Sequence, residues 1–457
     1  RMAEVLNRVI EKAIRGSAPA QINVPRDFWT QVVDIELPQI VRLERPAGGL
    51  DAITKAAELL SNAKFPVILS GAGVVIGGAI PDCVALAERL DAAVCNGYQH
   101  NDSFPGSHPL AAGPLGYNGS KAGMELIQKA DVVLALGTRL NPFSTLPGYG
   151  IDYWPQDAEI IQVDMNSDRI GLTKKVTIGI CGDAKMVAQQ LLAQLSNTAG
   201  DTNRDARKAI IHQTKSAWLQ ELSSMDHEDD DDGTSWNADA RIRDADRMSP
   251  RKAWRAIQAG LPADAIISSD IGNNCAIGNA YPTFEKGRKY LAPGLFGPCG
   301  YGFPSIIGAK IGCPDTPVVG FSGDGAFGIS MNELSSIGRD EWPAITMVIF
   351  RNYQWGAEKR NSILWYADNF IGTELDPHLS YAKVAEGCGL KGVTVKNQDE
   401  LTSELAAACK AQDDGVTTFI EVILNQELGE PFRRDAMKTP VEVAGISASD
   451  MRPQKGV

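Results

Sequence analysis

The stretch Gly320-Phe321-Ser322-Gly323-Asp324-Gly325-Ala326-Phe327-Gly328 (GFSGDGAFG) directly follows an apolar run that ends in Val318-Val319. A strand that ends in Gly-Asp-Gly and continues as a helical pattern places a carboxylate among exposed backbone amides. Gly-Asp-Gly is also common turn chemistry. The tripeptide alone therefore leaves two interpretations open, a metal ligand beside a phosphate or a simple tight turn.

Apolar, β-branched runs alternate with helical stretches on both sides of this segment. In the second half, the pattern predicts strands at 265–270, 316–321, 345–350 and 418–424, and helices at 249–260, 328–338, 379–388 and 398–411. In the first half, it predicts strands at 66–70, 131–136 and 159–164, and helices at 50–62, 80–90 and 183–195. This alternation is typical of α/β proteins with consecutive open parallel-sheet domains.

The chain of 457 residues is long enough for about three domains of about 150 residues each. Residues 1–28 are expected to form a helix and a short strand at 20–25, and residues 29–48 a linker. An α/β domain is expected over 49–196 and a second one over 246–457, which includes a C-terminal tail. Residues 197–245, which contain the like-charge run 227–232, are predicted to be an acidic linker.

Composition narrows the class of protein. A net charge of −12 argues against a nucleic-acid-binding protein, and no apolar run reaches the roughly 18 residues that a membrane span needs. The eight cysteines include no Cys-x-x-Cys pair, which favours reduced thiols in a cytoplasmic protein. The five histidines show no metal-ligand spacing.

Three of the predicted strands end in polar loops, at 269–274, 322–327 and 351–356. Because ligands bind beyond the carboxyl ends of parallel strands, these loops are expected at one edge of the sheet. Asp324 and Asn352 lie 28 positions apart, which leaves room for one helix and one returning strand. Their side-chain oxygens suit Mg²⁺, which usually shares its ligands with bound phosphates.

The segment Gly323-Asp324-Gly325, followed after 26 intervening residues by Asn352, resembles the diphosphate-binding signature of thiamine-diphosphate-dependent enzymes. The resemblance implies thiamine diphosphate and Mg²⁺ as cofactors, with the side chains of Asp324 and Asn352 and the carbonyl of Gln354 as metal ligands. Many relatives have Asn-Asn where this chain has Arg351-Asn352. The other residues that it implies at the cofactor are Asp270, Gly272, Asn273, Ser322, Gly323, Gly325, Ala326, Trp355 and Gly356.

A second segment, 297–304, resembles the loop that holds the cofactor bent in this family, and it assigns Pro298, Cys299 and Gly300 to the cofactor site. Relatives often carry Met, Leu or Ile where this chain has Cys299. The alternative for Cys299 is a buried inert thiol.

The resemblance extends over the whole chain. Residues 1–28 look like the end of the pyrimidine-binding domain, so a segment on the order of 150 residues, with the glutamate that activates the cofactor, is expected ahead of Arg1. The middle domain looks like the central, transhydrogenase-like domain, in which some relatives bind FAD and others nothing. Gly71-Ala72-Gly73 does not continue as Gly-x-Gly-x-x-Gly. The family's shared cofactor site implies a homodimer or homotetramer.

Within the family, the segments 351–360 and 365–375 most resemble a desulfonating acyltransferase branch that acts on a small sulfonated aldehyde and phosphate. Position makes Glu358 the candidate for proton transfer. Lys359 and Arg360 are weaker candidates for binding the anionic substrates, the alternative being a solvated basic helix end. The runner-up is an acetolactate synthase or 2-oxo-acid decarboxylase. A non-catalytic cofactor-binding scaffold is the alternative if the N-terminal domain is absent.

Overall fold

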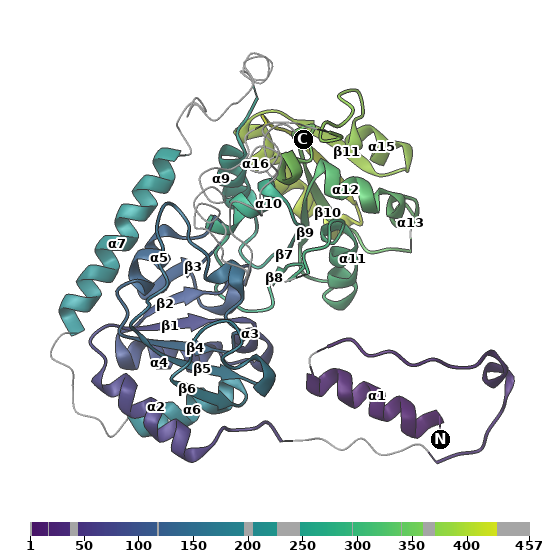
Figure 1. The fold of residues 1–457 in the computed structure, drawn as a ribbon. Coiled ribbons are helices and arrows are strands. Elements are labelled where there is room, and N and C mark those ends of the chain that lie inside the picture. Colours follow the sequence, from purple (N-terminus) through teal and green to yellow (C-terminus); the bar gives the residue numbers. More distant parts are fainter. Residues whose placement is uncertain are drawn as a thin grey trace, which may run out of the picture.

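The computed structural model describes residues 2–16, 18–36, 44–116, 118–195, 204–225, 247–294, 296–339, 341–359 and 371–426. Within these ranges the chain forms two six-stranded sheets in which all strand pairs are parallel. Each sheet is flanked by helices, so the α/β fold with consecutive open parallel sheets is confirmed (Figure 1).

The first sheet has the strand order β3-β2-β1-β4-β5-β6. Its strands are β1 (Pro66–Ser70), β2 (Ala93–Asn96), β3 (Ala111–Pro114), β4 (Val132–Leu136), β5 (Glu159–Asp164) and β6 (Ile178–Cys181). The helices of this unit are α2 (Leu50–Asn62), α3 (Ala72–Gly77), α4 (Ile80–Leu90), α5 (Lys121–Ile127) and α6 (Ala184–Leu195). Helix α6 packs against α2 and α4. The chain reverses its direction of winding between β1 and β4, which is where such sheets form ligand crevices.

The second sheet has the strand order β11-β12-β10-β9-β7-β8. Its strands are β7 (Ile266–Ser269), β8 (Tyr290–Leu291), β9 (Val318–Gly323), β10 (Thr346–Arg351), β11 (Lys391–Val395) and β12 (Thr418–Ile423). Its helices are α9 (Pro250–Gly260), α10 (Asn273–Ile277), α11 (Gly302–Gly312), α12 (Asp324–Ser330), α13 (Leu334–Ile337), α15 (Tyr381–Gly387) and α16 (Gln398–Ala411).

Strand β10 shows how the second sheet is buried on both faces. Val348 and Phe350 belong to the core cluster that contains Trp254 of α9, whereas Met347 and Ile349 belong to the cluster on the opposite face. Successive side chains of a strand point to opposite faces, so a continuous apolar run is what a strand covered on both sides requires.

The two sheet units are joined by hydrogen bonds between loops. The Asn101 side chain donates to the carbonyls of Asn279 and Pro282, both at 2.9 Å. The Lys289 amide donates to Asp102 at 2.9 Å. These contacts attach the carboxyl edge of the first sheet to the segment that leads into β8.

Helix α7 (Arg204–Met225) lies inside the range 197–245 that the sequence analysis assigns to a linker, so that assignment is wrong for these residues. It packs on α5 and buries Ile211, Trp218 and Leu222. The signal is a narrow apolar stripe among charged residues, which composition alone does not reveal. The acidic run 227–232 lies outside the described residues.

Two other local predictions are wrong. Residues 20–25 form no strand and belong to neither sheet in the described part of the chain. They follow helix α1 (Met2–Gly16). The helix predicted at 328–338 begins at Asp324 instead and is divided into α12 and α13 by a 3₁₀ turn at Met331–Glu333. Among the described helices, none is long and apolar enough to cross a membrane.

Substitution Trp218→Ala is expected to lower the free energy of unfolding by about 3 kcal/mol. The Trp218 ring packs edge-on against Tyr149, with 5.4 Å between ring centroids, so its removal leaves a cavity under α7. The neighbouring Leu219 is 61% exposed, and Leu219→Ala is expected to change stability by less than about 0.5 kcal/mol. Urea unfolding measures both values. Equal effects of the two substitutions would contradict the docking of α7.

Candidate active site

A cavity of about 180 Å³ lies at the carboxyl ends of β7, β9 and β10. The loops at 269–274, 322–327 and 351–356 therefore meet at one edge of the sheet. Residues assigned to the site from sequence that line this cavity are Gly272, Asn273, Cys299, Gly323, Asp324, Gly325, Ala326, Asn352, Gln354, Trp355, Gly356 and Glu358. Sequence reasoning missed Ile271, Asn274, Cys275, Gly297 and Ala357 in its wall, although each adjoins an assigned residue or one of these loops.

The Asp324 carboxylate begins helix α12 and is almost completely buried. Its Oδ1 accepts the amide of Gly325 at 3.0 Å, and its Oδ2 accepts the amide of Tyr353 at 2.7 Å and Nη1 of Arg351 at 2.9 Å. Burial raises the pKa of the Asp324 carboxyl to about 6, against the lowering effect of Arg351 and of the amide donors. The group is thus mainly ionised at neutral pH and fixed in orientation from three sides.

Tyr353 separates Asn352 from Gln354 and has a φ of 61°. This left-handed conformation is uncommon for a residue with a bulky side chain and persists only where the surroundings enforce it. The Tyr353 amide is held by Asp324, and its carbonyl accepts the amide of Leu375 at 2.9 Å. The resulting turn places both Asn352 and Gln354 in the wall of the cavity.

The oxygen donors of this cavity fit a hard divalent cation. Asp324, the Asn352 amide and the carbonyl of Gln354 are oxygen ligands of the kind that Mg²⁺ prefers. Buried Oδ1 of Asn274 and Oε1 of Gln354 have no hydrogen-bond partner, so the site retains polar capacity for a ligand. In the described parts of the chain, no group of three or more His, Cys, Asp and Glu side chains could hold a metal. A cation here would need further oxygens, such as those of a diphosphate.

Position 325 requires glycine because its backbone lies directly against the Trp355 ring. A Cβ atom at position 325 would lie 2.8 Å from the indole ring, whereas one at Gly323 would meet nothing within 4 Å. The turn after β9 therefore has no side chain on the face covered by Trp355. Backbone amides in such a turn can come close to a ligand's phosphates.

Asp270 does not line the cavity, but its carboxylate joins segments that lie next to the cavity wall. Its Oδ1 accepts the amides of Ile271 and Gly300 at 2.8 and 3.1 Å, and its Oδ2 accepts the amide of Gly302 at 2.8 Å and the hydroxyl of Ser322 at 3.3 Å. Burial raises the pKa of Asp270 although these donors oppose it. Ser322, Pro298 and Gly300 likewise are not among the residues that line this cavity.

Glu358, Lys359 and Arg360, the three charged residues that follow the loop at 351–356, differ in their surroundings. Glu358 is exposed and lines the cavity. Lys359 is buried outside the lining and forms an ion pair with Glu374, which also accepts Nε2 of Gln426 at 3.2 Å. Arg360 lies outside the described residues.

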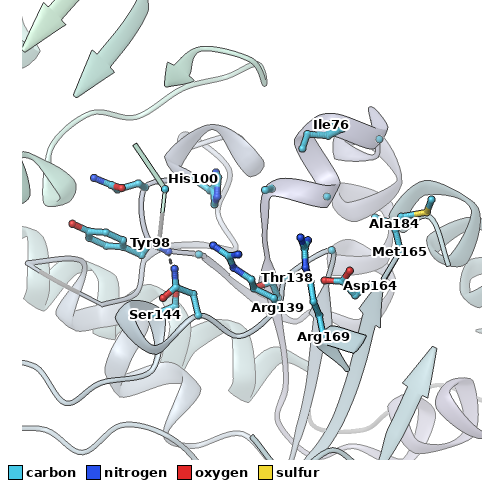
Figure 2. A pocket seen from close by; sticks show the side chains of 18 of the residues that line it. Ile76, Tyr98, His100, Thr138, Arg139, Ser144, Asp164, Met165, Arg169 and Ala184 are labelled. Carbon is cyan, nitrogen blue, oxygen red and sulfur yellow. Dashed lines mark hydrogen bonds between the residues drawn. The ribbon is translucent and has the colours of Figure 1, made fainter. Parts of the chain in front are cut away.

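A second cavity of about 330 Å³ lies at the carboxyl edge of the first sheet. Figure 2 shows Arg139, Arg169, Asp164 and His100 around it. Burial and the nearby charge of Arg169 lower the pKa of Arg139, while Asp164 acts in the other direction.

Two glycines in the wall of this second cavity, Gly73 and Gly137, pack backbone against backbone. A Cβ at Gly73 would lie 2.7 Å from the Cα atom of Gly137, so the turns after β1 and β4 touch directly. This contact accounts for Gly73 without a nucleotide. Gly73 is therefore no evidence for bound FAD.

The central and C-terminal parts of the chain match known family models. The model described as the central domain of thiamine pyrophosphate enzymes matches residues 53–191. The model described as the C-terminal TPP binding domain of the same enzymes matches residues 270–422. The chain therefore belongs to the thiamine pyrophosphate enzymes.

Curated relatives narrow the group. A probable sulfoacetaldehyde acetyltransferase of Rhizobium meliloti is 77% identical over 100% of this chain and 77% of that protein. The sulfoacetaldehyde acetyltransferase of Roseovarius nubinhibens is 74% identical over 100% of this chain and 76% of that protein. A probable acetolactate synthase large subunit of Methanocaldococcus jannaschii is only 30% identical, over 89% of this chain and 67% of that protein. The similarity over the whole chain is thus greater to sulfoacetaldehyde acetyltransferases.

Substitution Gly325→Ala is expected to destabilise the protein by about 1–3 kcal/mol, because the added methyl group overlaps the Trp355 ring. Gly323→Ala is the matched control two residues away and is expected to leave the cofactor-free protein within about 0.5 kcal/mol of the original stability. Urea unfolding without cofactor separates the two effects. A neutral Gly325→Ala would show that Trp355 does not cover the turn.

Burial, with a smaller effect of Arg139, lowers the pKa of His100 from 6.5 to about 4. Above pH 6.5 both the folded and the unfolded chain hold this histidine neutral. As the pH falls from 6.5 towards 4, His100 is protonated in the unfolded chain but stays neutral in the folded chain. The free energy of unfolding therefore decreases in that window. Urea unfolding between pH 4 and 8 should show this loss reduced in a His100→Gln variant. Identical pH profiles for the two proteins would contradict it.

Proposed function

We propose that this protein is a thiamine-diphosphate- and Mg²⁺-dependent acyltransferase that converts sulfoacetaldehyde and phosphate to acetyl phosphate and sulfite. The observation that carries the proposal is the identity of 69–77% to three sulfoacetaldehyde acetyltransferases over nearly the whole chain. The cavity at β7, β9 and β10 supports it, because most of the residues expected at the cofactor line it.

The proposed reaction balances without an external oxidant. The C–S bond of sulfoacetaldehyde breaks, and sulfite leaves with the bonding electron pair. The carbon that carried sulfur gains a proton and becomes a methyl group, while the aldehyde carbon rises to the oxidation level of an acyl group and is transferred to phosphate. When bound, thiamine diphosphate supplies the nucleophile and the electron sink for this exchange.

We assign the residues of the cavity as follows. The side chains of Asp324 and Asn352 and the carbonyl of Gln354 would hold Mg²⁺, and the turn at Gly323–Ala326 would bind the diphosphate. Glu358 is the carboxyl group in the cavity wall that is exposed to incoming substrate. We assign to this carboxyl group the proton exchange with the carbon that loses sulfite.

Charge at the cavity narrows the candidates for binding the anionic substrates. None of the lining residues within the described ranges is a lysine or arginine. Lys359 is paired with Glu374, so it is a poorer candidate than its position in the sequence indicates. Arg360 keeps that proposed role.

We further propose that the active form is a homodimer or homotetramer in the cytoplasm. The family resemblance supports the oligomer, because the cofactor's pyrimidine is bound by a domain of a second subunit in such enzymes. All eight cysteines are free, which suits a reducing compartment.

Incubation of the full-length protein with sulfoacetaldehyde, phosphate, Mg²⁺ and thiamine diphosphate should release sulfite and acetyl phosphate in equal amounts. Asp324→Ala should abolish Mg²⁺-dependent cofactor binding, because it removes the only carboxylate among the proposed ligands. Sulfite by colorimetric assay, acetyl phosphate as its hydroxamate and cofactor affinity by calorimetry measure these outcomes. Release of CO₂ from pyruvate with neither product would favour an acetolactate synthase or 2-oxo-acid decarboxylase instead.

A further inference from the structure

Arg351 is the last residue of β10 and is fully buried, directly before the proposed metal ligand Asn352. Its guanidinium donates from Nη1 to Oδ2 of Asp324 at 2.9 Å. Nη2 donates to the carbonyl of Asp376 and, at 3.0 Å, to the carbonyl of Leu379. One side chain thus joins the loop after β9, the end of β10 and the loop that leads into α15.

Two buried carboxylates flank this guanidinium. Besides Asp324, Oε1 of Glu421 on β12 lies 3.7 Å from Nε of Arg351. Glu421 is itself held by the hydroxyl of Ser380 at 2.6 Å and the amide of Tyr381 at 3.1 Å. Buried charges are costly unless they are paired and hydrogen-bonded, and Arg351 lies beside both carboxylates as their positively charged partner.

Arg351 also supports the strained turn beside it. Its guanidinium carbon lies 4.2 Å from the centre of the Tyr353 ring, and that of Arg247 lies 4.5 Å from the same ring. A cation over an aromatic face is attracted to it. The ring of Tyr353 is therefore anchored while its backbone has the positive φ that separates Asn352 from Gln354.

We propose that Arg351 is a positioning residue for the metal centre, which orients the Asp324 carboxylate and, through Tyr353, the turn that carries Asn352 and Gln354. The proposal rests on the proposed function, because it takes Asp324, Asn352 and Gln354 as the metal ligands. Groups that hydrogen-bond to metal ligands commonly change metal affinity about 10- to 100-fold when they are replaced.

The fork geometry of arginine is essential to this role. A lysine keeps the positive charge but offers a single ammonium group, which cannot reach Asp324, Asp376 and Leu379 with separate planar donors. Arg351→Lys therefore keeps the positive charge but loses the hydrogen bonds that orient Asp324. Arg351→Gln loses both the charge and these hydrogen bonds.

The test measures binding of Mn²⁺, an oxygen-preferring substitute for Mg²⁺, to the full-length protein with thiamine diphosphate, by electron paramagnetic resonance. Arg351→Lys is expected to weaken Mn²⁺ binding about 3- to 10-fold, and Arg351→Gln about 10- to 100-fold. The spectrum of the bound ion should also change, because the carboxylate is no longer held in one orientation.

The matched control is Arg207→Gln. Arg207 on α7 is also buried and also donates to several backbone carbonyls, those of Lys64, Leu90 and Asp91, but it lies in the other sheet unit. Its loss should lower thermal stability without changing Mn²⁺ affinity. Affinity loss in both arginine variants would reduce Arg351 to a general structural role and overturn the proposal.

Original Mn²⁺ affinity in Arg351→Lys, with an unchanged spectrum, would also overturn the proposal. This variant carries the test if Arg351→Gln does not fold. Failure of the proposed metal site is a different outcome, in which the original protein and Asp324→Ala bind Mn²⁺ equally weakly.

Discussion

Parallel pairing of β7, β9 and β10 is the constraint on which the site depends. Gly323 is paired with Phe350, and Phe321 with Ser269, so the three strands end within a residue or two of one another. Asp324 and the turn at Asn352–Gln354 then follow as neighbours, although many residues separate them in the chain. Since the three strands are parallel, the polar loops that follow them lie at the same edge of the sheet and line one cavity.

Several charged side chains are buried at the same edge of the sheet, and each of them needs a partner there. Asp324, Glu421 and Arg351 are all within the sheet edge and nearly inaccessible to water. Buried charged groups need hydrogen-bond partners, and the backbone of Gly325, of Tyr353 and of the segment 376–382 supplies most of them. Asp270 repeats the arrangement one strand away, where its carboxylate accepts the amide of Ile271 and the amides of Gly300 and Gly302 in the 297–304 loop. The cavity is therefore bounded by two buried carboxylates, one facing it and one behind it.

Long elements with a continuous apolar period were predictable from sequence, and β1, β5, α2 and α16 have the predicted bounds. The missed strands are short or poor in apolar residues: β3 contains glycine and proline, and β11 is a half-exposed edge strand. At the site, Gly-Asp-Gly and Asn352 identified the loops because their spacing reflects the return of one strand. What sequence could not show is the direction of each side chain. Asp270 and Ser322 turn inwards to hold the loop, Lys359 turns to Glu374, and only the folded register distinguishes them from lining residues.

The contact between Trp355 and the backbone of Gly325 has an optical consequence. An indole ring that lies directly on the turn after β9 senses any change in the field or solvation of that turn through its excited state. The backbone amide of Trp355 donates to the carbonyl of Thr373 at 2.8 Å, so the backbone that bears the ring is held in the wall of the cavity. Trp355 is thus an intrinsic fluorophore at the place where a charged ligand would arrive, and a protein in which the other seven of eight tryptophans are replaced would report occupancy without an added label.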